Sequence, residues 1–228
     1  MYTSYLIKAI YVILLVACLN ACNSNTTNDT PSSSSPTHAL RVACVGDSIT
    51  EGYTLSNMAI ESYPSQLSML VANDVEVRNF GIRGATVLKK SNYPYWDTRY
   101  YKQSKQFNPE IVVLMFGTND IKNINWNNKK NFIPDYSALI NSYKKLNTKP
   151  TIYICLPPPS YTNVQGITNK RMIQELIPNI KQVAQRNEVG IIDIHTLLTN
   201  KEALFSDKIH PNAEGARQIA EAVYRAIY

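Results

Sequence analysis

Short apolar runs recur along the chain beyond residue 39, and longer segments with a different spacing separate them. Five of these runs have the length and composition of β-strands. The run at residues 110–116 is almost wholly apolar, as expected for a central strand that is covered on both faces. The other four runs lie at residues 40–45, 75–80, 151–155 and 189–194.

The segments between these runs have the spacing of helices. In residues 135–146 the apolar side chains recur at positions i, i+3, i+4 and i+7, which predicts an amphipathic helix. Residues 62–72 predict another helix, with Leu67, Leu70 and Val71 on one face. The remaining expected helices are 97–106, 167–188 with an interruption near Pro178, and 212–226 with Asn212 as its N-cap.

Strands that alternate with helices predict an α/β fold built from right-handed βαβ units. We therefore expect a three-layer α/β/α sandwich around a five-stranded parallel sheet, with the strand order 2-1-3-4-5. No internal repeat is present, and residues 40–228 leave no room for a second domain.

The N-terminus has the pattern of a secretory signal peptide. Lys8 precedes an apolar run of nine residues, which is too short to cross a bilayer. The run ends in Leu-Val-Ala-Cys, which resembles the lipobox of bacterial lipoproteins, where the cysteine is acylated and becomes the new N-terminus. We predict a signal peptide at residues 1–17 and lipidation at Cys18, with Cys22 as the alternative. Ordinary secretion with cleavage nearby is the other interpretation.

Residues 18–39 are rich in serine, threonine and asparagine and have little apolar surface to bury. This composition predicts a flexible tether. Residues 40–228 are long enough for one domain with a sizeable core. The sequence therefore predicts an exported bacterial lipoprotein, anchored to a membrane by its lipid and facing the periplasm or the cell surface.

The chain carries a formal net charge of +6 and four cysteines. Basic residues gather between residues 83 and 105, which favours acidic partners or a solvated lysine-rich surface, and we prefer the second interpretation. No nucleic-acid motif accompanies the charge, so no such partner is expected. Cys44 and Cys155 fall in strands about 9.6 Å apart in the predicted order, too far for a disulfide.

Residues with catalytic potential follow the ends of the predicted strands. Because ligands of parallel α/β sheets bind beyond the carboxyl ends of the strands, these segments are expected to converge. In strand order they are Ser48, Gly84, Asn119, the prolines 157–159, and the pair Asp207 and His210.

Three of these residues fit nucleophilic catalysis. A serine hydroxyl is a weak nucleophile until an imidazole accepts its proton and a carboxylate orients the imidazole. Ser48, His210 and Asp207 are the candidates for these roles. This chemistry requires neither a metal nor an organic cofactor.

Four sequence blocks together resemble the GDSL or SGNH hydrolase family. The blocks are Gly-Asp-Ser-Ile-Thr at Ser48, Gly-Ile-Arg-Gly-Ala-Thr at Gly84, Gly-Thr-Asn-Asp at Asn119, and Asp-Lys-Ile-His at His210. The resemblance covers roughly residue 40 to the C-terminus and implies a flavodoxin-like fold and ester hydrolysis. It also implies an oxyanion hole made by the backbone N–H groups of Ser48 and Gly84 and the side-chain amide of Asn119.

The substrate is less well determined by the sequence, because such families act on many esters. Segments 79–90, 94–96 and 115–122 resemble exported bacterial carbohydrate O-acetylesterases of the sialate or xylan type. Tyr95, Trp96 and Trp126 are therefore candidate sugar-binding residues.

Two alternatives remain open. One is a lysophospholipase, a general short-chain esterase or a thioesterase, although no long apolar lid helix is evident. The other is a non-catalytic glycan-binding lipoprotein, against which the intact Ser48, Asp207, His210 and Asn119 argue. The sequence leaves the oligomeric state open.

Overall fold

The computed structural model describes residues 39–228. The predicted signal peptide, both candidate lipidation sites and nearly all of the tether lie outside the described residues and stay predictions. Among the residues that are described, no helix is long and apolar enough to cross a membrane.

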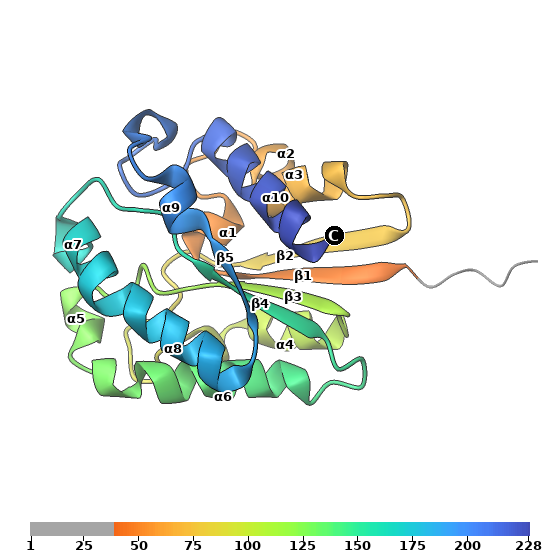
Figure 1. Cartoon of the computed structure of the whole chain (residues 1–228), viewed down its shortest axis with the longest axis horizontal. Helices are drawn as coiled ribbons and strands as arrows, with labels where there is room; N and C mark the ends of the chain where they lie inside the picture. Colours follow the sequence, from red (N-terminus) through yellow and green to blue (C-terminus); the bar gives the residue numbers. More distant parts are fainter. Residues whose placement is uncertain (1–38) are drawn as a thin grey trace, which may run out of the picture. The chain divides into compact units, whose positions relative to one another are not determined.

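One parallel sheet forms the centre of the fold (Figure 1). Its strand order is β2-β1-β3-β4-β5, which confirms the predicted order. The strands end at the residues where the candidate chemistry begins. Their bounds are β1 (Leu40–Gly46), β2 (Val75–Gly81), β3 (Ile111–Met115), β4 (Thr151–Leu156) and β5 (Gly190–Asp193).

Helices cover both faces of the sheet, as predicted for a three-layer α/β/α sandwich (Figure 1). One layer holds α3 (Tyr63–Leu70), α9 (Ile194–Leu198) and α10 (Ala213–Ile227). The other holds α4 (Arg99–Gln106), α6 (Phe132–Lys144) and α8 (Ile177–Asn187). Because side chains alternate along a strand, β1 buries Val42 and Cys44 in the first layer and Ala43 and Val45 in the second.

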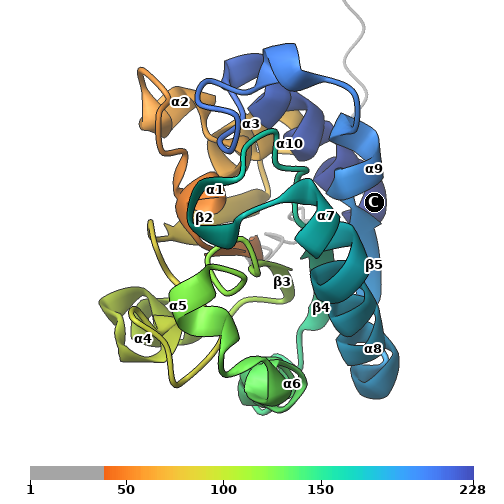
Figure 2. The same ribbon diagram turned by 90° about the vertical axis from the view of Figure 1, so that its left-hand side faces the viewer.

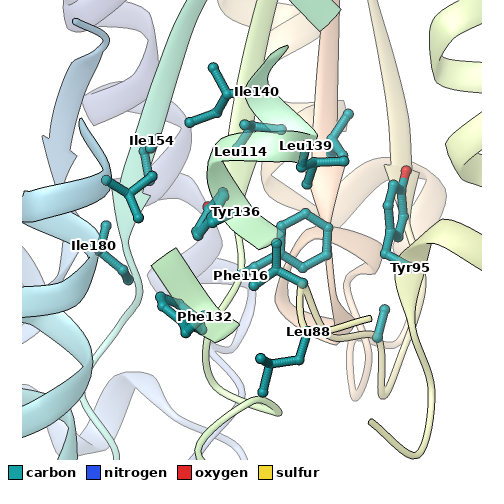
Figure 3. Close-up of a cluster of buried hydrophobic side chains, with 14 of the residues drawn as sticks. Leu88, Tyr95, Leu114, Phe116, Phe132, Tyr136, Leu139, Ile140, Ile154 and Ile180 are labelled. Atoms are coloured by element: carbon teal, nitrogen blue, oxygen red, sulfur yellow. The ribbon is translucent and has the colours of Figure 1, made fainter. Parts of the chain in front are cut away.

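The larger hydrophobic cluster lies between the sheet and α6 (Figure 3). Tyr136, Leu139, Ile140 and Tyr143 on this helix are all fully buried, which confirms the face predicted from the 3.6-residue spacing. The Tyr136 ring meets the ring of Phe116, the residue that follows β3, and both belong to this cluster. This packing holds the residues that follow β3 in place.

Two helix predictions were partly wrong. Helix α3 buries Tyr63, Pro64 and Leu67, but Leu70 is 42% exposed because the helix ends there. The segment 167–188 divides into α7 (Asn169–Arg171), a π-helical turn and α8. The division precedes Pro178, which sits in the first turn of α8, where a missing N–H leaves no helical hydrogen bond unmade.

Several short helices were not predicted. Most lie in the connections at the carboxyl ends of the strands. They are α1 (Ser48–Glu51), α2 (Met58–Glu61), η1 (Tyr95–Asp97), α5 (Asn123–Trp126), η2 (Lys129–Asn131), η3 (Val164–Gly166), α9 and η5 (Glu202–Leu204). The π-helical turn η4 (Met172–Leu176) lies within the predicted helix 167–188.

Candidate active site

The carboxyl edge of the sheet carries the candidate chemistry, as expected for this fold. Figure 2 looks onto this edge, with α1, α5 and α7 lying around it. The segments that follow β1, β2, β3 and β5 meet here, although they are far apart in the sequence.

Ser48 sits on a tight turn between β1 and α1. The Asp47 carboxylate caps α1 by accepting a hydrogen bond from the Ile49 N–H at 2.9 Å. A side chain at Gly46 would collide with Thr50 and with the Met115 carbonyl, so only glycine allows this close approach. The turn places Ser48 as the first residue of the helix, 5% exposed.

A chain of hydrogen bonds joins Ser48 to His210 and Asp207. The Ser48 Oγ lies 2.9 Å from His210 Nε2, and His210 Nδ1 lies 2.7 Å from Asp207 Oδ2. The other oxygen of Asp207 accepts hydrogen bonds from the backbone N–H groups of Ile209 and His210. The loop is therefore folded around the carboxylate, which holds the imidazole toward the serine.

The contacts of Asp207 determine which atoms donate in this series of hydrogen bonds. Partial burial acts to raise the pKa of Asp207, but the hydrogen bonds from His210 and Ile209 outweigh it and lower that pKa below its usual value. An ionised Asp207 can only accept, so the His210 Nδ1–H donates to it. His210 Nε2 is then the free acceptor that faces the Ser48 hydroxyl.

The three predicted oxyanion donors lie close together. The Asn119 side chain is 5% exposed, and its Nδ2 lies 3.2 Å from the Ala85 carbonyl and 3.4 Å from Asp47 Oδ2. Ala85 and Asp47 are the chain neighbours of Gly84 and Ser48. The Asn119 amide thus lies between the two segments whose backbone N–H groups were predicted to complete the hole.

Gly84 is required here for its backbone conformation. Its φ of +80° lies in the left-handed region that side chains disfavour. The space around it is open, because an added Cβ would meet only the Tyr93 ring at 3.7 Å. The sequence argument that a side chain would obstruct the approach to the backbone was therefore not the main reason for glycine.

Two buried carboxyl groups support the site without touching the Ser48 hydroxyl. Asp120 accepts hydrogen bonds from the backbone N–H groups of Val87 and Leu88 and so ties the loop after β2 to the loop after β3. Burial raises the pKa of Asp120 to about 7, and burial likewise raises that of Asp47 to about 7.

This burial predicts that stability falls as the pH rises. Both carboxyls bind protons more tightly in the folded state than their ordinary pKa of 3.8 allows in the unfolded chain. Their contribution is therefore complete below about pH 4 and is lost as the pH rises toward 7, at up to about 1.4 kcal/mol per pH unit for each group. Urea unfolding measures the free energy of unfolding at pH 5 and at pH 8. We expect this free energy to fall less between the two pH values in Asp120→Asn than in the wild type. If the free energy of unfolding falls equally in Asp120→Asn and the wild type, this account is wrong. It is also wrong if the exposed control Asp97→Asn reduces the pH dependence as much as Asp120→Asn does.

The sequence analysis missed Tyr53. Its ring meets the His210 ring edge-on at 5.0 Å and is 40% exposed, so it lines the solvent side of the imidazole. The Arg83 guanidinium lies 4.7 Å above the same ring and is paired with Glu51. The only sequence signal for Tyr53 is its place just after the glycine that ends α1.

The three candidate sugar-binding aromatics do not form an exposed platform. Tyr95 is fully buried and its hydroxyl donates to the Phe80 carbonyl at 2.9 Å. Trp126 is 6% exposed and its Nε1–H donates to Glu175. Tyr95 is therefore enclosed by the fold and cannot contact a substrate there, which corrects that prediction. Trp126 lines a hollow with Lys129 and Glu175, so its sugar-binding role stays a prediction. Trp96 is half-buried, donates to the Val87 carbonyl and lies under the Lys89 ammonium.

Within residues 39–228, no three His, Cys, Asp or Glu side chains are grouped so that they could hold a metal ion. Cys44 and Cys155 are both buried free thiols.

Comparison with known protein families identifies the family of this chain. The model of the GDSL-like Lipase/Acylhydrolase family matches residues 44–218, a span that contains Ser48, Gly84, Asn119, Asp207 and His210. The chain belongs to this family. Its membership and the sheet order agree with the resemblance that the four sequence blocks indicated.

A curated relative and two solved structures extend the comparison. The chain is 34% identical over 207 residues to an acetylxylan esterase of Xylanibacter ruminicola, covering 83% of this chain and 43% of that protein. It thus spans less than half the length of that relative. The fold is similar to a carbohydrate acetylesterase family member from Sinorhizobium meliloti (TM-score 0.65, 20% identity, 82% and 97% of the two chains). It is also similar to the aryl esterase of M. smegmatis, with a TM-score of 0.66 and 17% identity, over 83% of this chain and 98% of that one.

Proposed function

We propose that residues 40–228 form a serine esterase that hydrolyses O-acetyl or other short-chain acyl esters, with an acetylated carbohydrate as the substrate. The observation that carries the proposal is the continuous hydrogen-bonded chain from Ser48 through His210 to Asp207. Membership in an acylhydrolase family supports ester hydrolysis as the reaction.

The geometry allows each step of acyl transfer. Ser48 Oγ attacks the ester carbonyl carbon while His210 Nε2 takes the hydroxyl proton, and the Asp207 carboxylate stabilises the resulting imidazolium. The negative charge on the former carbonyl oxygen faces the N–H groups of Ser48 and Gly84 and the Asn119 amide. When the tetrahedral intermediate collapses, the C–O bond to the alcohol breaks and His210 returns its proton to that alcohol.

Water completes the cycle. It attacks the acyl-Ser48 carbonyl as His210 removes one of its protons, and the same oxyanion donors stabilise the second intermediate. Cleavage of the bond to Ser48 Oγ then releases the carboxylic acid and restores the serine hydroxyl. Every proton in this sequence passes through His210 Nε2, which is why its 2.9 Å contact with Ser48 matters.

The similarity to an acetylxylan esterase supports acetylated carbohydrate as the substrate class. The test is acetate release by purified residues 39–228 from acetylated xylan, xyloglucan, pectin and sialic acid, with p-nitrophenyl acetate and octanoate as controls. We expect acetate from at least one glycan and a preference for acetate over octanoate. Strong octanoate cleavage without glycan turnover favours the lysophospholipase or general esterase instead.

The oxyanion role of Asn119 predicts a specific kinetic signature. Asn119→Ala removes a donor that matters most when charge develops on the substrate oxygen, so kcat is expected to fall by about 10²- to 10³-fold with little change in KM. Steady-state kinetics on p-nitrophenyl acetate measure both constants. Asn127→Ala, an exposed asparagine next to α5, is the matched control. A rise in KM with no change in kcat would show that Asn119 binds the ground state and the transition state equally well, which contradicts the oxyanion role.

A further inference from the structure

A cavity of about 380 Å³ adjoins the segment that follows Asn119. This volume is at the lower end of the roughly 300–1,000 Å³ of small-ligand sites. Its walls come from the loop after β2, from α5 with the residue before it, and from the loop after β4. The lining residues are Asn92, Lys122, Asn123, Ile124 and Gln165.

Hydrogen bonds tie this cavity to the oxyanion side of the site. The Lys122 N–H donates to the Asn119 carbonyl at 3.3 Å, so the lysine is held one turn after that residue. The buried Asn125 amide donates to the same carbonyl and to Asn92 Oδ1. Tyr93, which follows Asn92, is the side chain nearest to Gly84. A substrate whose ester reaches Ser48 therefore places its neighbouring groups close to this cavity.

The polar groups left unused around the cavity are mainly hydrogen-bond donors. Asn92 Oδ1 is taken by Asn125, and Asn123 Oδ1 is taken by Arg171 at 2.8 Å. The side-chain N–H groups of Asn92 and Asn123 remain without a partner within residues 39–228. Ile124, which is 68% exposed, adds an apolar surface that suits the C–H face of a sugar ring.

Lys122 is the one charged side chain that lines the cavity, and within residues 39–228 its ammonium has neither a hydrogen bond nor an ion pair. It is half-buried. The charged groups of the adjoining hollow are paired differently, because Glu175 accepts from Lys129 Nζ at 2.8 Å and lies 3.9 Å from Arg171. The buried Asp47 carboxyl next to Ser48 interacts electrostatically with Lys122 but forms no ion pair with it.

We propose that this cavity binds the carboxylate of an acidic sugar, with Lys122 as its main contact, so that the preferred substrate carries a uronic acid near the acetyl ester. The inference rests on the proposed carbohydrate esterase function. A carboxylate only accepts hydrogen bonds, which matches an unpaired ammonium flanked by amide donors. A neutral sugar would leave the half-buried Lys122 ammonium without an ion pair.

The test compares two substrates that differ by an acidic branch. Acetylated xylo-oligosaccharides with a glucuronic acid branch are compared with the same oligosaccharides after enzymatic removal of the uronic acid. We expect a lower KM for the acidic substrate in the wild type, and a preference that weakens with added salt. Lys122→Met should shift the ratio of the two KM values by about 10- to 100-fold, and Lys122→Arg should restore much of it. Lys129→Met is the matched control, because that lysine is already paired with Glu175.

Binding separates this inference from the catalytic proposal. Calorimetry with the Ser48→Ala protein and an unacetylated glucuronic-acid-bearing xylo-oligosaccharide requires no turnover. Binding that Lys122→Met abolishes supports the acidic-sugar site even if no acetate is released by the wild type. Equal KM values for the two substrates in an active wild type, or an equal effect of Lys129→Met, overturn the site while leaving the esterase in place.

Discussion

Replacing Ser48 by alanine will reduce kcat by a factor on the order of 10⁵ to 10⁶, because no other hydroxyl is hydrogen-bonded to His210 Nε2 within the described residues. The substitution removes only the attacking oxygen. The Asp47 cap, the Gly46 turn and the bonds between Asp207 and His210 do not involve that oxygen. Acetate release and p-nitrophenyl acetate hydrolysis measure the loss, and thermal unfolding checks the fold.

The control for this experiment is Ser68→Ala. Ser68 is an exposed serine on α3, remote from the carboxyl edge of the sheet, and its loss should leave both kcat and KM unchanged. If Ser48→Ala keeps activity within a few-fold of the wild type while remaining folded, Ser48 is not the nucleophile and the proposed mechanism is wrong.

Asp207→Asn is expected to lower kcat by about 10³- to 10⁴-fold. The asparagine oxygen can still accept the backbone N–H groups of Ile209 and His210, so the loop should keep its conformation. Its amide N–H₂, however, would face His210 Nδ1. This favours the wrong imidazole tautomer, in which Nε2 carries the proton and cannot accept the one from Ser48. The developing imidazolium also loses its counterion.

Asp193→Asn provides the comparison for Asp207. Asp193 caps α9 at the end of β5, and asparagine caps helices about as well as aspartate, so little change in activity or stability is expected. A loss of less than tenfold in Asp207→Asn would indicate that the backbone alone orients His210. An equal loss in Asp193→Asn would point to a general effect of charge at this edge.

The fold was largely predictable because its determinants are local and periodic. The face of α6 and the apolar β3 run follow from the 3.6-residue and two-residue repeats of side chains. The interruption in residues 167–188 was only approximately predicted. A proline indicates that a helix begins or ends nearby, but it does not indicate whether the irregular turn lies before or after it. Leu70 was misplaced because the point where a helix ends depends on what the chain packs against next.

The same contrast applies to the site. Sequence order alone determined that Ser48, Gly84, Asn119 and the Asp207–His210 pair follow successive strands, and a parallel sheet must bring such positions to one edge. Tertiary packing decided which polar and aromatic groups remain available there. The rings of Tyr95 and Trp126 are buried among the loops that carry them, whereas Tyr53 stays exposed beside His210.

By itself, then, the sequence determined the sheet order, the layers and the identity of the residues at the carboxyl edge, because each depends on spacing along the chain. Only the tertiary structure decided the 2.9 Å contact of Ser48 with His210, the burial that raises the pKa of Asp120, and the unpaired Lys122 beside its cavity. These properties depend on distances and solvent exclusion between segments remote in sequence, which no local pattern of residues encodes.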